Sequence, residues 1–136
     1  MIDYAALKTE LDTDPTGRGY AAASDIAAAE LLNEVQGGIT VNVTSVLMAE
    51  VLEAIVPADW VALTDGERAG LLLYASQDTL NPNAANVVDA FTTFFAATPT
   101  LTALNALQTR NGSRAEELWG ENVVIHHIDV AIARSL

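Results

Sequence analysis

The segment 37–56, GGITVNVTSVLMAEVLEAIV, constrains the fold of this chain more than any other. The apolar residues that alternate with polar ones at its start are Ile39, Val41 and Val43. This two-residue period predicts a short, half-buried strand. Ser45 then predicts the start of an apolar helix, and Pro57 predicts its end, because the residue before a proline is pushed out of helical space. A strand followed directly by a helix is therefore expected in the middle of the chain.

Start and stop signals along the rest of the chain predict further short helices. The most specific are two capping boxes, Thr64 with Glu67 and Ser113 with Glu116, in which each side chain accepts a hydrogen bond from the other residue's backbone. Asp3, Ser24 and the Thr98-Pro99 pair mark three more starts. The expected helices cover residues 4–11, 25–36, 46–56, 65–76, 84–97, a segment from 98 to about 110, and 114–119.

The end of the chain resembles its middle. Residues 120–134, GENVVIHHIDVAIAR, repeat the order of residues 38–50: a glycine, a short apolar segment, a polar pair and a helix containing alanine. A chance likeness in a chain rich in valine and alanine explains the pattern equally well. If the repeat is real, the two short strands can pair. We therefore predict a mainly α fold, a compact bundle of six to eight short helices with a minor two-stranded β pairing of about 39–43 with 123–126.

Length and composition favour a single globular domain over residues 1–136. A chain of this size buries roughly two-thirds of its unfolded surface and needs no disulfide or metal to fold. The net charge is −12, which opposes direct binding to nucleic acids and to acidic membranes. There is no cysteine, which excludes disulfides, thiolate nucleophiles and cysteine-based zinc sites. No window of 18 uninterrupted apolar residues predicts a membrane span.

Three groups of residues are candidates for chemical sites. His126 and His127, near Asp129, carry side chains that can bind zinc or iron, but their spacing matches no zinc motif, and a capping or strand-edge role is favoured. The tripeptide at 17–19, Gly-Arg-Gly, could cradle an anion, but it lacks the strand and helix of a phosphate loop. Paired acids such as those at 50 and 53 are typical of a solvated face. We therefore predict no catalytic residue, no cofactor and no metal.

The segment 92–109, TTFFAATPTLTALNALQT, carries no charge. Because the cores of protein interfaces are depleted of charge, this segment is a candidate contact surface. Burial in the domain itself is the favoured role of Phe91, Phe94 and Phe95. The residues predicted to contact a partner are Thr100, Thr102 and Asn105.

Three segments together suggest a family. They are IDYAALKTELDTDPTGRGYA near the start, AEVLEAIVPADWVALTDGER in the middle and SRAEELWGENVVIHHIDVAIARSL at the end. In this order they resemble a family of small bacteriophage and prophage proteins encoded in virion structural gene regions, with the matching blocks at 4–21, 50–64 and 113–134. The apolar ITVNV segment departs from the more basic stretch of some family members. The resemblance implies a virion protein and carries over no functional residue.

The function expected from these observations is non-enzymatic. We expect a virion structural protein, an accessory subunit of the tail, neck or baseplate and fibre attachment, made in the bacterial cytoplasm and located in the particle. Its partners would be other virion proteins and symmetric copies of itself. A capsid decoration protein is an alternative. A soluble acidic inhibitor of a host DNA-binding protein is an alternative of another class, and it would gather its acids in a ridge, whereas a structural subunit would spread them.

Overall fold

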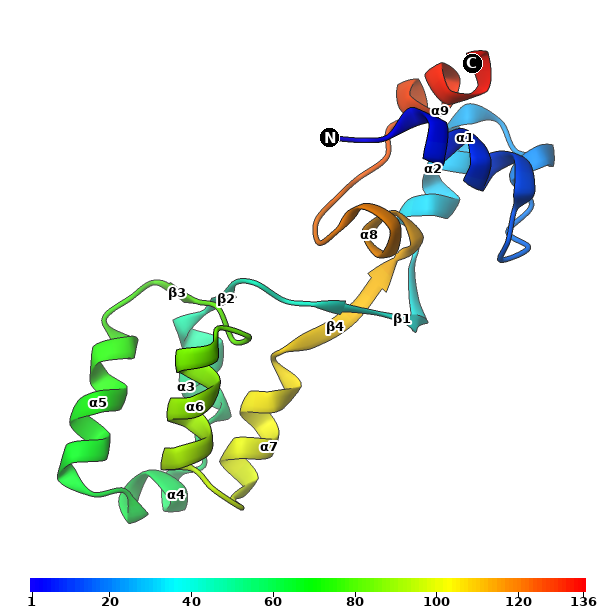
Figure 1. Cartoon of the computed structure of the whole chain (residues 1–136). Coiled ribbons are helices and arrows are strands. Elements are labelled where there is room, and N and C mark those ends of the chain that lie inside the picture. Colours follow the sequence, from blue (N-terminus) through cyan, green and yellow to red (C-terminus); the bar gives the residue numbers. More distant parts are fainter. The chain divides into compact units, whose positions relative to one another are not determined.

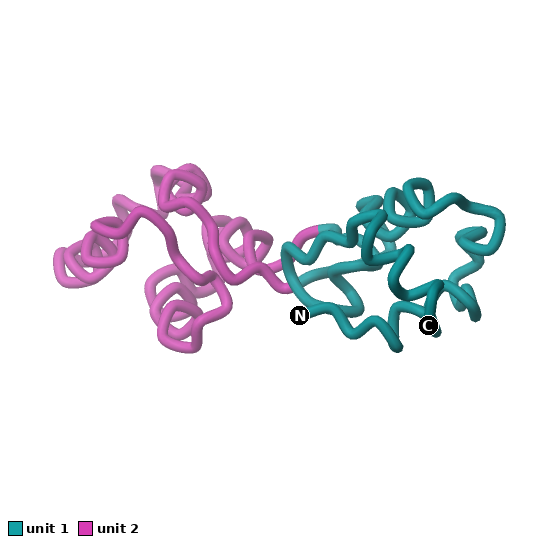
Figure 2. Tube along the Cα trace, turned by 90° about the horizontal axis from the view of Figure 1, so that it is seen from above, with its two compact units in different colours: residues 1–41, 111–136 teal, residues 42–110 magenta.

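Nine α-helices, one 3-10 helix and two small two-stranded sheets make up the computed structural model, which describes all 136 residues (Figure 1). The mainly α class with a minor β pairing is confirmed. The contacts divide the chain into two compact units (Figure 2). Unit 1 comprises Met1–Val41 and Asn111–Leu136, and unit 2 comprises Asn42–Arg110. Unit 2 is therefore inserted in the sequence of unit 1, and each unit has its own hydrophobic core.

Unit 1 is built from both ends of the chain. Its elements are α1 (Tyr4–Thr13), η1 (Tyr20–Ala22), α2 (Asp25–Asn33), β1 (Val35–Asn42), β4 (Thr109–Ser113), α8 (Arg114–Trp119) and α9 (His127–Ser135), the last residue of β1 and the first two of β4 lying in unit 2. Helix α9 packs against both α1 and α2. The buried core residues are Leu7, Leu11, Tyr20, Ala28, Ala29, Leu32, Ala115, Ile125, Val130 and Ala133.

The predicted helix starts of unit 1 are confirmed. The Asp3 carboxylate accepts hydrogen bonds from two N–H groups in the first turn of α1, at 3.0 and 3.1 Å. Ser24 caps α2 in the same way. The capping box of Ser113 and Glu116 opens α8. Helix α2 ends at Asn33, before the predicted end, because the chain enters β1 at Val35.

The predicted pairing of 39–43 with 123–126 is wrong. Strand β1 pairs instead with β4, and residues 123–126 belong to no sheet. Ile125 finds a side-chain partner: the Asn33 amide donates to its carbonyl oxygen at 2.7 Å and accepts from its N–H at 2.9 Å. One side-chain amide therefore satisfies the backbone groups that a strand would have used. In β4, Gly112 is required because a Cβ atom there would overlap the side chain of Val41.

Unit 2 is one continuous segment of chain. Its elements are β2 (Val46–Leu47), α3 (Met48–Ala54), α4 (Pro57–Ala62), α5 (Asp65–Ala75), β3 (Thr79–Leu80), α6 (Ala85–Phe94) and α7 (Pro99–Ala106). Strands β2 and β3 are antiparallel, with Val46 opposite Leu80. The buried core residues are Val43, Val46, Met48, Val51, Leu63, Leu71, Leu80, Val87, Phe91, Phe95 and Leu104. Tyr74 meets Phe91 edge to face, with ring centroids 6.2 Å apart.

The predicted helix starts of unit 2 are confirmed to within one residue, with one clear exception, whereas α6 and α7 end at Phe94 and Ala106, before their predicted ends. The capping box of Thr64 and Glu67 opens α5, and Thr98 caps α7. Ser45, however, does not begin a helix, because the next two residues form β2. Helix α3 begins after Leu47, whose N–H donates to the Glu50 carboxylate at 2.9 Å.

The two ends of unit 2 are bonded to each other. The Val43 N–H donates to the Gln108 carbonyl oxygen at 2.9 Å. The Asn83 side-chain amide donates to both the Val43 and the Gln108 carbonyl oxygens, at 2.7 and 2.8 Å. The points at which the chain enters and leaves unit 2 are thus joined within that unit.

Candidate functional site

The histidine pair lies at the start of α9, where His126 is the N-cap residue and His127 is the first residue of the helix. Both side chains are exposed. The His126 N–H donates to the Asp129 carboxylate at 2.8 Å, and the other oxygen of this buried carboxylate accepts from the Tyr4 hydroxyl at 3.0 Å. The hydrogen bond to Asp129 raises the pKa of Tyr4. No group of three or more histidine or acidic side chains in the chain is arranged to hold a metal ion.

The Gly-Arg-Gly loop cradles an anion that belongs to the chain itself. The N–H groups of Arg18 and Gly19 each donate to one oxygen of the Asp14 carboxylate, at 2.7 Å. Desolvation raises the pKa of Asp14, but these N–H donors outweigh it and bring the pKa below its ordinary value. The Arg18 guanidinium donates to the Leu31 carbonyl oxygen at 2.7 Å. The loop is therefore filled by its own carboxylate.

A cavity of about 470 Å³ lies beside this loop and is lined by Arg18, Arg114 and Glu117, among others. Both arginine side chains already have hydrogen-bond partners within unit 1. Arg114 donates to the two Glu10 oxygens at 2.8 and 2.9 Å and to Glu117 at 2.7 Å. The hydrogen bond to Glu10 raises the pKa of Arg114, which burial alone would lower.

Tyr20 is fully buried, its hydroxyl has no hydrogen-bond partner, and burial raises its pKa to about 12.

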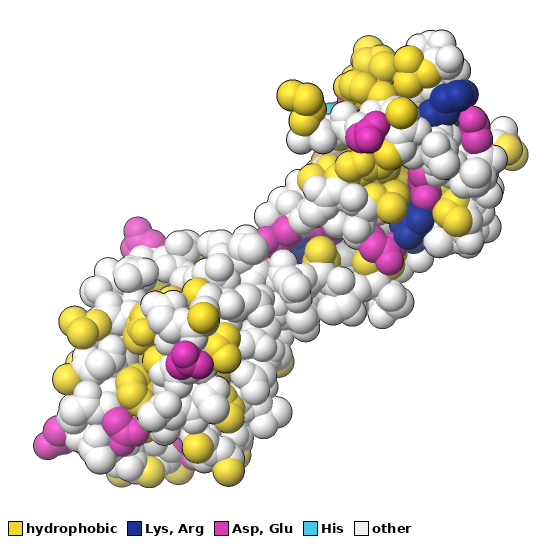
Figure 3. Space-filling model, in the orientation of Figure 1, with side chains coloured by type: hydrophobic (Ala, Val, Ile, Leu, Met, Phe, Trp, Pro, Cys, Tyr) yellow, Lys and Arg dark blue, Asp and Glu magenta, His cyan; other side chains and the backbone are white.

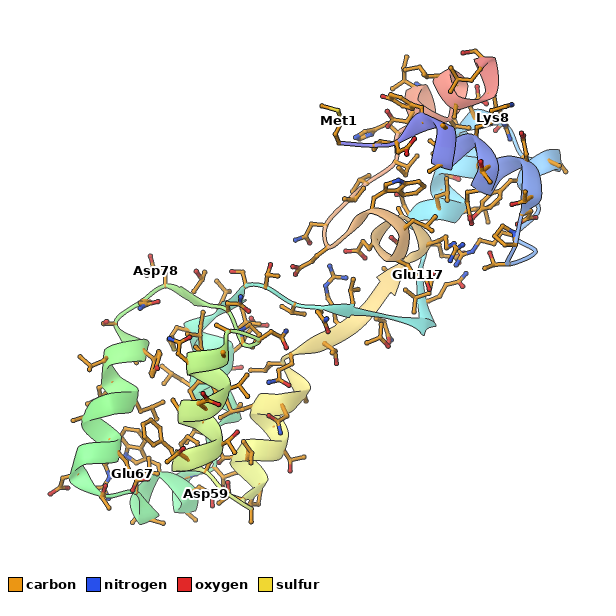
Figure 4. The ribbon with its side chains drawn as sticks, viewed as in Figure 1. Met1, Lys8, Asp59, Glu67, Asp78 and Glu117 are labelled. Atoms are coloured by element: carbon orange, nitrogen blue, oxygen red, sulfur yellow. The ribbon has the colours of Figure 1, made fainter.

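The predicted contact residues separate into buried and exposed positions. Thr100 was predicted to contact a partner, and this is wrong, because its side chain is fully buried. Its hydroxyl donates to the Asp59 carboxylate at 2.6 Å and accepts from the Val56 N–H at 2.8 Å, which ties α7 to α4 (Figure 4). Thr102 and Asn105 are exposed on α7, and their role as contacts stays a prediction.

The acids at 50 and 53 are exposed on α3, and Glu50 caps that helix. The predicted core role of Phe91 and Phe95 is confirmed, because both are buried in unit 2. Phe94 packs against the same core while remaining partly exposed. Its ring lies over Gly70, where an added Cβ atom would come within 3.2 Å of a ring carbon.

A surface that the sequence analysis missed lies on and beside α9. Four apolar residues spaced by four remain exposed: Ile128 (59%) and Ile132 (38%) within the helix, and Val124 (52%) and Leu136 (69%) just outside its two ends. Figure 3 shows hydrophobic side chains gathered over α9. The four-residue spacing is present in the sequence, but it was overlooked because residues 123–126 were predicted to form a strand. In unit 2, Leu72 and Leu73 are likewise exposed on α5.

The acidic residues are spread over both units. Unit 1 has eleven acids and four bases, a net charge of −7, and unit 2 has seven acids and two bases, a net charge of −5. Figure 3 shows carboxylate side chains over each unit. Three of the acids of unit 1 form ion pairs with arginines: Glu10, Asp25 and Glu117.

None of the helices combines the length and the apolar character that crossing a bilayer requires. Comparison with protein-family models, with curated proteins and with solved structures finds no match to this chain.

Proposed function

We propose that this chain is a non-enzymatic structural subunit of a bacteriophage particle, located in the tail, neck or baseplate and acting through contacts with neighbouring proteins. The observation that carries the proposal is the presence of exposed apolar side chains on both units. Ile128 and Ile132 on α9, with Val124 and Leu136 just outside that helix, belong to unit 1. The adjacent pair Leu72 and Leu73 belongs to unit 2. Single exposed apolar residues are ordinary, but groups of them mark interaction surfaces.

The resemblance to phage proteins supports the particle as the setting. Its blocks fall in both units: residues 4–21 and 113–134 in unit 1, and residues 50–64 in unit 2. The wide distribution of the acids favours a structural subunit over an inhibitor that imitates nucleic acid, because an inhibitor needs its carboxylates in one ridge.

Mass spectrometry of purified particles of the phage or prophage that encodes the chain tests this proposal. We expect the chain in the particle at about six, twelve or eighteen copies, the numbers that closed rings of a tail or neck produce. A copy number close to that of the major capsid protein would support decoration of the capsid instead. Absence from washed particles, together with salt-sensitive binding to a host DNA-binding protein, would overturn the proposal.

A further inference from the structure

We propose that Asn111 is a site of spontaneous modification, at which the side-chain amide is converted to a carboxylate when strand β4 opens. Asn111 lies in β4 and its side chain is exposed to water. It is also the one asparagine of the chain that is followed by glycine. This inference goes beyond the proposed function and does not depend on it.

The reaction needs only Asn111, Gly112 and water. After losing its proton, the Gly112 main-chain nitrogen attacks the side-chain carbonyl carbon of Asn111, a C–N bond forms, and the side-chain nitrogen leaves as ammonia. Water then opens the resulting five-membered imide at either of its two carbonyl carbons. The products are aspartate, or isoaspartate, in which the main chain runs through the former side-chain carbon. Glycine favours the attack because it has no Cβ atom to obstruct it.

The conformation of β4 holds the two reacting atoms apart. The imide ring closes only when the ψ angle of the asparagine brings the next main-chain nitrogen towards its own side chain. The ψ angle of an extended strand turns this nitrogen away. Pairing with β1 keeps β4 extended. The reaction therefore requires β4 to leave its partner at Asn111.

Two neighbours of Gly112 add to this restraint. Gly112 is buried, and a Cβ atom placed on it would overlap the side chain of Val41. The same position lies 3.2 Å from a Glu116 carboxylate oxygen, which accepts from the Ser113 N–H at 3.0 Å. A negative charge at this distance opposes loss of the proton from the Gly112 nitrogen. The folded chain therefore restrains the reaction by packing and by charge.

The isoaspartate product does not fit β4. It adds one carbon atom to the main chain, which displaces the residues that follow along the strand. Gly112 has no room for this displacement, because Val41 packs directly on it. Ser113 is held in place by its capping box with Glu116. A transient opening of β4 would thus become a permanent loss of its pairing with β1.

Mass spectrometry of peptides from the whole chain, incubated at mildly alkaline pH, tests the site. Conversion at position 111 should be at least about tenfold faster in denaturant than in the native chain, a ratio that corresponds to ~1.4 kcal/mol of opening free energy. A peptide of the sequence TRNGS, measured in both solvents, corrects for the effect of denaturant on the chemistry. Equal corrected rates would overturn the restraint by β4, and no conversion in denaturant would overturn the site.

A pair of variants separates the opening of β4 from the stability of unit 1. Val41→Ala removes the side chain that covers Gly112 and should raise the native rate at least about threefold, while the rate in denaturant stays the same. Val130→Ala is the matched control, because it truncates a fully buried valine of the same unit on α9. It should change the native rate less than about twofold. If both variants speed the conversion equally, unfolding of unit 1 rather than opening of β4 controls the reaction.

Hydrogen exchange tests the consequence for the strand. The aspartate and isoaspartate forms are separated by chromatography after incubation, and amide exchange is measured on each. The isoaspartate form should lose protection in β1 and β4, and the aspartate form should keep it. Protection that is unchanged in the isoaspartate form would overturn the permanent loss of pairing.

Discussion

The two units of this chain are stabilised in different ways. The core of unit 1 contains four alanines, which bury little area, and its distant segments are joined by polar contacts: Arg114 with Glu10, Arg134 with Asp25, Tyr4 with Asp129, and Asn33 with Ile125. The core of unit 2 is built from larger aromatic and aliphatic side chains. Unit 1 thus relies more on specific long-range bonds, whereas unit 2 relies more on apolar packing, to which the bonds of Thr100 and Asn83 are added.

Each unit contains one tryptophan, Trp60 in unit 2 and Trp119 in unit 1. Replacing either by phenylalanine leaves a fluorescence reporter for the other unit alone. Denaturant unfolding followed through these reporters measures the stability of each unit separately.

Phe95→Ala should destabilise unit 2 by about 4 kcal/mol, because removing a buried aromatic ring leaves a cavity. The Trp60 transition should shift to lower denaturant while the Trp119 transition keeps its midpoint. Equal shifts of both transitions would show that the units unfold as one and would weaken the comparison.

Arg114→Met should destabilise unit 1 by about 3 kcal/mol, because it leaves the buried Glu10 carboxylate without its partner. The Trp119 transition reports the loss. Lys8→Met is the matched control: its pair with Asp12 is exposed and should contribute less than about 0.5 kcal/mol. If the two variants lose equal stability, the polar contacts of unit 1 are not what joins its segments.

Thr100→Val should destabilise unit 2 by about 2 kcal/mol, since Asp59 and the Val56 N–H lose a buried partner. The exposed Thr102→Val is the control and should stay within about 0.5 kcal/mol. The Trp60 reporter measures both. If Thr100→Val leaves the free energy of unfolding unchanged, the stability of unit 2 comes from its apolar core alone.

Asp14→Asn should have the smallest effect, and that effect should depend on pH. The folded pKa of Asp14 lies below its ordinary value of 3.8, so its charged form stabilises unit 1 above that value and loses this contribution as the pH falls through the folded pKa. The variant should be less stable than the wild type at pH 7, and the difference should vanish in stronger acid. Glu30→Gln, which removes an equal charge from an exposed site, is the control. A difference that is constant with pH would exclude the loop carboxylate as its source.

Local signals were readable in the sequence and distant ones were not. The capping boxes at Thr64 and Ser113 were predictable because each is complete within four residues. The pairing of β1 with β4 was not, because Thr-Arg-Asn-Gly-Ser has no strand pattern and only its proximity to β1 makes it one.

The errors at the candidate contact surface have the same origin. Thr100 is polar and lies in an uncharged segment, and nothing in its own neighbourhood reveals that Asp59, 41 positions earlier, draws it into the interior. The exposed apolar residues on and beside α9 could have been found, because their four-residue spacing is local. They were missed because the residues before the helix were assigned to a strand.

The bonds that Asn83 makes to Val43 and Gln108 have a consequence for how this chain can change. They join the two ends of unit 2 to each other, so residues 42–110 enter and leave unit 1 at one place. Such a cassette can be exchanged, duplicated or lost in evolution without rethreading the rest of the polypeptide. The side chain of Asn83 makes the hydrogen bonds on which this modular arrangement depends.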